Sequence, residues 1–245
     1  SNDWDEHMNC LRKILQKLQY HGFTCNPLKC EFCVQETDWL GYWLTPNGLK
    51  PWKKKIDPIL RLEPPTTIKE LRSFVGAVTF YRDMFPKRSH LLAPLTEQLG
   101  PTNTKKLNWT PECQKAFDKV KAIIAKDAFL AYPDHNKPFD IYCDASDYQL
   151  GAAIFQNGQP VAYYSRKLNK AQKNYTVAEK EMLSIVETFK EYRSMLYGAE
   201  LKVYTDHRNL TFQNLNSQRV LRWRLFLEEF HPIFYYIKGD KNGLA

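Results

Sequence analysis

The segment 139–155, FDIYCDASDYQLGAAIF, constrains the fold of this chain most strongly. An apolar run leads to Asp144, a turn of small and polar residues follows, and a second apolar run leads away. This pattern predicts a strand that ends in a carboxylate and a hairpin that returns beside it. A third strand, a helix, a strand, a helix and a last strand are expected after it. The alternation predicts an α/β sheet with crossover helices from about residue 137 onward.

Two further acids recur in similar settings. Glu181 lies beside the apolar face of the expected helix, and Asp206 ends the apolar run LKVYTD. Three carboxylates at one edge of a sheet repel one another unless cations lie between them. Hard divalent cations such as Mg²⁺ take oxygen ligands and keep positions open for water and phosphate. The acids therefore suggest a metal site that hydrolyses phosphodiesters by in-line attack.

Three neighbouring residues have competing interpretations. Glu179 is the rival of Glu181, but Glu181 lies nearer the buried face and is preferred. Asp147 falls in a turn, where Asp commonly makes local hydrogen bonds, and is interpreted as structural. His207 either contacts substrate or relays a proton, or it caps the next short helix; the sequence does not decide between these.

The charge of the chain points to a polyanionic partner. Its 245 residues carry a formal net charge of +8, and nucleic acid is the first candidate for a basic surface. A membrane is not expected, because the sequence has no long apolar span and no signal-like start. Without a secretion signal, the six cysteines are expected to be reduced thiols.

The upstream part shows helix and hairpin patterns. Apolar residues at helical spacing predict a helix over about 3–20, a strand is expected at 32–34, and a hairpin at 37–49 turns at PNG. The Pro pair at 64–65 marks a boundary. Beyond it, Thr67 and Glu70 can form a capping box for a helix that reaches about residue 85, and a further helix is expected over about 111–126.

A set of motifs in fixed order resembles a known family. YCDAS, GAAI, YYSRKL, NYTVAEKEMLSIV, VYTDHRNL and RVLRWRLFLEEF follow NPLKCEF, WLGYWLTPNGL and TIKELRSFVGAVTFYRDMF. Together they resemble the C-terminal part of the reverse transcriptase/RNase H of gypsy-type (metavirus) LTR retrotransposons. The resemblance implies an α/β, RNase H-like mixed sheet with flanking helices over 133–245, lacking its last helix. It also implies the end of a reverse-transcriptase palm over 1–62, and thumb and linker helices over 63–132.

The resemblance implies two activities in the parent protein, RNA-templated DNA synthesis and cleavage of RNA in RNA/DNA hybrids. Asp144 would bridge two Mg²⁺ (or Mn²⁺) ions, and Glu181 with Asp206 would hold the ion near the leaving group. The YxDD motif of the polymerase is absent from this chain, and the aspartate matching the fourth RNase H carboxylate would follow Ala245. The chain alone is therefore expected to be impaired in both activities. The alternative is a non-catalytic nucleic-acid-binding tether.

The resemblance and the residue types also predict contacts to nucleic acid. The expected partners are an RNA/DNA hybrid, a template-primer duplex and the rest of the polyprotein (fingers and palm, integrase), within an intracellular virus-like particle in the cytoplasm or the nucleus. The alternative for the lysines is a solvated charged face, although contact is favoured, and helix packing could equally explain Gly76. The predicted contacts are Trp39, Gly41, Tyr42, Lys53, Lys54, Arg72, Gly76, Tyr81, Ser165, Arg166 and Lys167.

Overall fold

The structure, a computed structural model, describes residues 3–100, 106–126, 128–206, 217–238 and 242. The chain divides into two compact units, residues 1–35 and 36–245. The first contains α1 (Trp4–Tyr20) and the 3₁₀ helix η1 (Pro27–Lys29). The Asp3 side chain caps α1 by accepting the Glu6 N–H at 2.8 Å, which confirms the predicted first helix. The strand expected at 32–34 is wrong, because Cys33 has a φ of 59° and cannot continue an extended strand.

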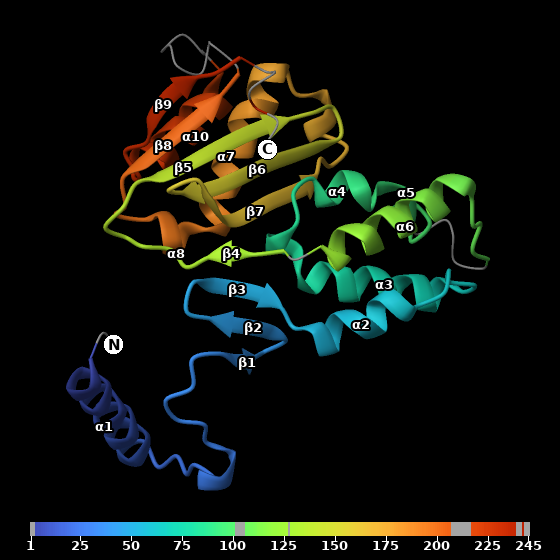
Figure 1. The fold of residues 1–245 in the computed structure, drawn as a ribbon. Coiled ribbons are helices and arrows are strands. Elements are labelled where there is room, and N and C mark those ends of the chain that lie inside the picture. The colour runs from blue at the N-terminus through green and yellow to red at the C-terminus, as the bar shows by residue number, and fades with distance from the viewer. Residues whose placement is uncertain (1–2, 101–105, 127, 207–216, 239–241, 243–245) are drawn as a thin grey trace. The chain divides into compact units, whose positions relative to one another are not determined.

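The second unit begins with a small antiparallel sheet, which confirms the predicted hairpin and adds strands on either side of it (Figure 1). The strands follow the order β1-β2-β3-β4 and are β1 (Thr37–Trp39), β2 (Tyr42–Thr45), β3 (Gly48–Pro51) and β4 (Leu130–Ala131). Strand β4 comes from far along the chain and pairs Leu130 with Leu49. The chain therefore passes through a long helical segment between β3 and β4.

The helical segment between β3 and β4 contributes most of a separate apolar core. The predicted capping box of Thr67 and Glu70 is confirmed at the start of α3. Helix α3 ends earlier than expected, at Phe80, and a 3₁₀ turn replaces its last stretch. The Phe74 and Phe117 rings, 4.5 Å apart, lie at the centre of this core. The helices are α2 (Lys53–Arg61), α3 (Ile68–Phe80), η2 (Arg82–Met84), α4 (Arg88–Leu91), α5 (Ala93–Glu97) and α6 (Pro111–Ala125).

A five-stranded mixed sheet follows, in the order β7-β6-β5-β8-β9. The pairs β7–β6 and β6–β5 are antiparallel, whereas β5–β8 and β8–β9 are parallel. Its strands are β5 (Phe139–Ala145), β6 (Gln149–Gln156), β7 (Gln159–Lys167), β8 (Leu201–Thr205) and β9 (Ile233–Tyr236). Its helices are η3 (Gln172–Asn174), α7 (Val177–Glu191), α8 (Arg193–Leu196) and α10 (Gln218–Glu228). The predicted succession of strands and helices is confirmed.

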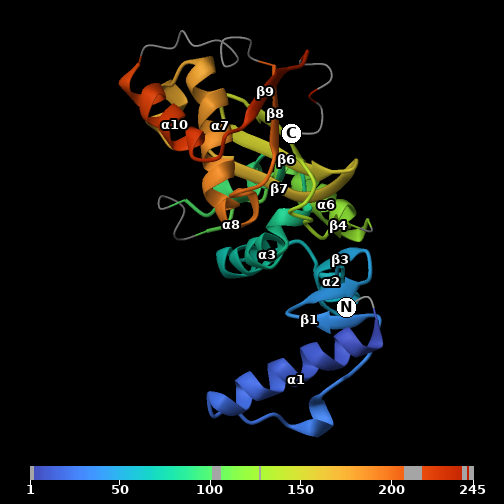
Figure 2. The same ribbon diagram turned by 90° about the vertical axis from the view of Figure 1, so that its left-hand side faces the viewer.

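Alternation along β5 separates the core from the face that carries Asp144. Phe139, Ile141 and Cys143 are fully buried in one apolar cluster with residues of α7 and α10. Those two helices lie together on one face of the sheet (Figures 1 and 2). Because successive side chains of a strand point to opposite faces, Asp144 points away from that core.

Candidate functional site

The carboxylates predicted from the sequence meet at one end of the central strands. Strands β5 and β8 are parallel neighbours in which Tyr142 pairs with Tyr204. Asp144 and Asp206 each follow two residues later, so both leave the sheet at the same edge. Glu181 reaches this edge from α7, where its Oε1 accepts the Ala145 N–H at 3.0 Å.

The electrostatics of the three acids are coupled. Glu181 is only 3% exposed, and its Oε2 is buried with no hydrogen-bond partner in the described part of the chain. Burial, followed by repulsion from Asp144 and Asp206, raises the pKa of Glu181 to about 8. Burial and Asp206 likewise raise the pKa of Asp144, while the positive charge of Lys87 opposes that rise. Sequence reasoning missed Lys87, since nothing in its local pattern links it to a strand end in another region.

The donor set suits a hard divalent cation, although its present arrangement is open. Three carboxylates, one with an orphaned buried oxygen, are the ligands that Mg²⁺ or Mn²⁺ prefers. Among the described residues, however, no group of three or more His, Cys, Asp or Glu side chains is placed so that it could hold a metal ion.

The neighbouring acids have structural partners. Glu179 completes the capping box of α7 with Thr176 and contacts Arg219 at 3.2 Å. Asp147 accepts a 2.7 Å hydrogen bond from the buried ammonium of Lys180. The Lys180–Asp147 contact ties the start of α7 to the turn after β5, and the Glu179–Arg219 contact ties it to α10. His207 lies outside the described residues.

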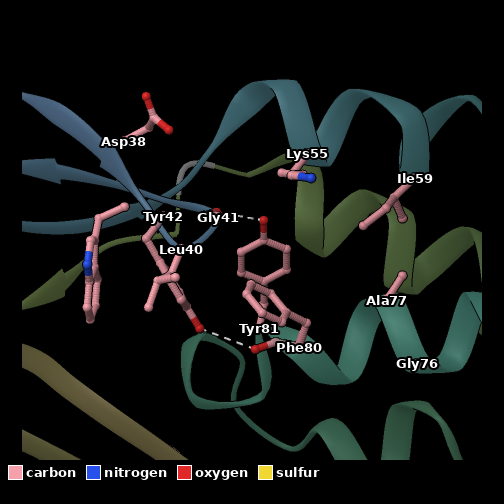
Figure 3. A pocket seen from close by; sticks show the side chains of 11 residues that line it. Asp38, Leu40, Gly41, Tyr42, Lys55, Ile59, Gly76, Ala77, Phe80 and Tyr81 are labelled. Carbon is pink, nitrogen blue, oxygen red and sulfur yellow. Dashed lines mark hydrogen bonds between the residues drawn. The ribbon is translucent and has the colours of Figure 1, made fainter. Parts of the chain in front are cut away.

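A cavity of about 960 Å³ gathers five of the predicted nucleic-acid contacts (Figure 3). Trp39, Gly41 and Tyr42 come from the β1–β2 hairpin, and Gly76 and Tyr81 come from α3 and its C-terminal end. We call this hollow the hairpin–helix cavity. It joins two segments that lie far apart in the sequence.

Two tyrosine hydroxyls hold the hairpin–helix cavity together. Tyr81 Oη donates to the Gly41 carbonyl at 2.8 Å, and Tyr42 Oη donates to the Phe80 carbonyl at 3.2 Å (Figure 3). Burial raises the pKa of Tyr81 to about 12, so this hydroxyl remains a donor at neutral pH. The backbone is therefore fixed at the point where the hairpin meets α3.

The hairpin turn exposes an apolar tip that sequence reasoning missed. Leu40 and Gly41 have φ values of 47° and 86°, the positive values that two-residue hairpin turns require. The Leu40 backbone is strained in this conformation, yet its side chain is 69% exposed beside the hairpin–helix cavity. Backbone strain of this kind clusters at sites that contact ligands. The turn signal could have been found in the sequence LG, but the exposure could not.

The remaining predicted contacts lie elsewhere. Arg72 is exposed on α3, one turn before Gly76. Lys53 and Lys54 begin α2 and line a second cavity. The Ser165 side chain is buried, and its Oγ accepts the Ser89 N–H at 2.9 Å.

Arg166 and Lys167 also have partners within the chain. Arg166 lies 3.3 Å from Glu187, and Lys167 Nζ lies 3.4 Å from Glu97. A phosphate role for Ser165 and these two residues stays a prediction, because the structure shows them in internal contacts only.

Gly76 gives a sharp test of the hairpin–helix cavity. A Cβ at this position would meet nothing within 4 Å, so packing among the described residues does not explain the glycine. We expect Gly76→Ala to stabilise the fold by about 0.5–1 kcal/mol, because alanine is the better helix former. If a nucleic-acid backbone approaches this helix, the same change should weaken duplex binding. Urea unfolding and fluorescence anisotropy measure the two effects, and unchanged affinity would argue against contact at Gly76.

The fold and the comparisons define the class of protein. A five-stranded mixed sheet with flanking helices, preceded by a region of sheet and helices, is an RNase H-like fold within a reverse-transcriptase framework. Residues 109–203 match the family model described as "RNase H-like domain found in reverse transcriptase". Foamy viral protease-reverse transcriptase with double-stranded DNA superposes with a TM-score of 0.80 at 23% identity, covering 97% of this chain and 44% of that chain. The same viral protein in complex with an RNA/DNA hybrid also superposes with a TM-score of 0.80, at 22% identity. That match covers 98% of this chain and 34% of the viral chain.

Curated relatives identify the region more closely. The chain is 36% identical over 251 residues to the retrovirus-related Pol polyprotein from transposon 297 of Drosophila melanogaster, covering 100% of this chain and 23% of the relative. It is 35% identical over 257 residues to the transposon Tf2-3 polyprotein of Schizosaccharomyces pombe, covering 100% and 19%. The chain thus spans about a fifth of the length of these relatives. The chain is therefore similar to a part of LTR-retrotransposon polyproteins, and its residues 109–203 match an RNase H-like domain found in reverse transcriptase. No helix in the described part of the chain is both long and apolar enough to span a membrane.

Proposed function

We propose that this chain is the palm end, thumb and RNase H portion of a gypsy-type reverse transcriptase, and that its RNase H-like domain hydrolyses the RNA of RNA/DNA hybrids. The observation that carries the proposal is the convergence of Asp144, Glu181 and Asp206 at one sheet edge, with a buried, unpartnered Glu181 oxygen among the described residues. A buried carboxylate oxygen without a donor is costly unless a cation or a proton satisfies it.

The chain's own residues support this chemistry in distinct ways. Asp144, Glu181 and Asp206 would hold Mg²⁺ or Mn²⁺. Bound ions would supply the activated water and neutralise charge on the phosphate. The Ala145 N–H orients Glu181 by holding its Oε1. Cleavage by this route leaves a 3′-OH and a 5′-phosphate.

The upstream part would hold the template-primer duplex at the hairpin–helix cavity. The gathering of Trp39, Gly41, Tyr42, Gly76 and Tyr81 around one hollow supports this role. Arg72, on the same helix as Gly76, would contact phosphate, which positions a duplex without reading its sequence. The remainder of the polyprotein, with fingers, palm and integrase, would supply the polymerase site within a virus-like particle.

A substitution of Asp144 tests the nuclease proposal. In the full parent protein, Asp144→Asn should lower Mg²⁺-dependent hybrid cleavage by on the order of 100-fold or more, because it removes one of the carboxylates that would hold the metal. Mn²⁺ binding by calorimetry should weaken in the isolated chain as well. Asp118→Asn is the matched control, since Asp118 is an exposed carboxylate of α6 that contacts Gln114 outside the cluster. Cleavage that survives Asp144→Asn would overturn the proposal.

A non-catalytic tether is the second candidate. Two observations favour it. No group of three or more His, Cys, Asp or Glu side chains among the described residues is placed to hold a metal ion, whereas the hairpin–helix cavity is well formed. A tether should bind duplex equally well with Mg²⁺ or with a chelator, and Asp144→Asn should leave that binding unchanged. Hybrid cleavage by the parent protein would exclude the tether.

A further inference from the structure

A second cavity, of about 600 Å³, lies on the other face of the β1–β2–β3 sheet. Successive strand residues point to opposite faces, so Tyr42 faces the hairpin–helix cavity while Trp43 faces this one. We call it the tryptophan–lysine cavity. The side chains that matter for its chemistry are Asp38, Trp43, Lys50, Trp52, Lys53 and Lys54.

The aromatic walls of the tryptophan–lysine cavity are held in place. Trp43 pairs across the sheet with Asp38 on one side and Lys50 on the other, so the three side chains form one row. The Trp43 indole N–H donates to a Glu36 carboxylate oxygen at 2.8 Å, which fixes the orientation of its ring. The Trp52 N–H donates to the Gly41 carbonyl at 3.1 Å, which ties the start of α2 to the hairpin.

The positive charge around this cavity is not used within the described part of the chain. Lys50, Lys53 and Lys54 are exposed, and no ion pair among the described residues includes any of them. Lys54 Nζ lies over the Trp52 ring, 5.4 Å from its centre, as a cation–π contact. Of the described residues that line the cavity, Asp38 alone carries a carboxylate.

The combination of aromatic faces with unpaired lysines matches the chemistry of a nucleotide. Every base has a flat face that stacks on an aromatic ring, and lysines beside it contact the phosphate. The volume suits a small ligand rather than a duplex. Asp38 repels phosphate, but its carboxylate can accept a hydrogen bond from the exocyclic amine of a base. Asp38 also lines the hairpin–helix cavity, so the two cavities adjoin.

We propose that the tryptophan–lysine cavity binds an unpaired nucleotide of a single strand that continues from the duplex held at the hairpin–helix cavity. The inference rests on the proposed duplex grip and adds a different ligand, a splayed base, at a different face of the hairpin. A face of solvated lysines alone would not need two tryptophans beside it, one of them with its ring fixed by a hydrogen bond.

The test compares a blunt duplex with the same duplex carrying a short single-stranded overhang, by fluorescence anisotropy. The overhang should increase the affinity of the wild-type chain by about tenfold, as expected for one stacked base. Trp52→Leu should remove this gain, and Trp52→Tyr should retain it, because tyrosine still stacks. Quenching of 2-aminopurine in the overhang should follow the same pattern.

The lysines are tested through the salt dependence of overhang binding. Lys53→Ser with Lys54→Ser should reduce the slope of log affinity against log salt by about 1.4, or about 0.7 for each single-strand phosphate that a lysine no longer neutralises. Lys115→Ser with Lys119→Ser, two exposed residues of α6, removes the same charge elsewhere and is the matched control. An equal reduction in both double variants would overturn the proposal.

The outcomes separate the inference from the proposed function. Tight but equal binding of blunt and overhang duplexes would overturn the tryptophan–lysine cavity as a nucleotide site and leave the duplex grip intact. Binding of neither duplex would overturn the grip itself. A gain that persists in Trp52→Leu would also count against the inference.

Discussion

Glu181→Gln should make the chain more stable than the wild type at pH 8 and above, and should remove most of the wild type's loss of stability with rising pH. The pKa of Glu181 is raised from an ordinary 4.5 to about 8 by burial and by the two neighbouring acids. The folded state therefore binds this proton more tightly than the unfolded state does. Its stabilising effect is fully present below about pH 4.5 and is lost as the pH rises through about 8.

The size of this effect makes it measurable. One pKa unit is worth about 1.4 kcal/mol, so a rise of this size corresponds to an upper bound of about 5 kcal/mol. Glutamine keeps the shape and has no proton to lose. Urea unfolding at a series of pH values from 5 to 9 should give a falling curve for the wild type and a flatter one for the variant. Glu179→Gln, which lies outside the cluster, should retain the wild-type slope.

A divalent cation separates this explanation from simple strain. Mg²⁺ or Mn²⁺ at pH 8 should restore stability to the wild type, because a ligand that binds only the folded state stabilises it. The same cation should not stabilise Glu181→Gln to that extent. Identical pH profiles for the wild type and Glu181→Gln would show that Glu181 is not the group whose ionisation destabilises the folded chain.

The sheet was predictable because its signals are local. Alternating apolar residues in 139–145 and the turn after them specify a strand and a hairpin without reference to the rest of the chain. The same applies to the capping box at Thr67, since its two partners lie three residues apart. Strand β4 was not predictable: two residues carry no periodic signal, and their pairing with β3 depends on long-range packing.

The site was predictable only in part, for a similar reason. Acids at strand ends are visible in a sequence, whereas the Lys87 charge beside Asp144 arises from the fold alone. Ser165 shows the limit most clearly. It lies on β7, an edge strand, whose outward groups need partners. The Tyr163 carbonyl accepts from Tyr192 Oη at 2.9 Å, and the Ser165 carbonyl accepts from Arg88 at 3.0 Å.

These edge contacts also join the helical segment to the RNase H-like sheet. The segment that contains η2 and α4 packs along β7, and Tyr192 Oη also lies 3.1 Å from a carboxylate oxygen of Asp83. The contacts cross the predicted boundary between residues 132 and 133. The helices and the RNase H-like sheet are therefore expected to unfold together, so that a destabilising substitution in one lowers the unfolding free energy of both.

Gly48→Ala should be among the most destabilising single substitutions in the second unit. Gly48 begins β3 and pairs with Ala131 of β4. A Cβ at this position would lie 2.1 Å from the Leu130 carbonyl oxygen and 2.7 Å from Phe129 Cζ. The oxygen belongs to the backbone and cannot rotate away, so β4 must separate from β3. We expect a loss of about 3 kcal/mol or more, at the upper end for point substitutions.

Gly158→Ala is the matched control, because it isolates backbone strain from the clash. Gly158 has a φ of 75°, and a Cβ there would meet nothing within 4 Å. Alanine should therefore cost only about 1–2 kcal/mol at this position. Urea unfolding gives both values, and hydrogen exchange at the Leu49 and Leu130 amides shows whether β4 has separated. Equal losses in the two variants would mean that the β3–β4 contact contributes little. A larger loss of unfolding free energy for Gly48→Ala, together with faster amide hydrogen exchange in β4, would show that β4 stabilises the hairpin. Strand β4 would then connect the hairpin to the segment that leads into the RNase H-like sheet.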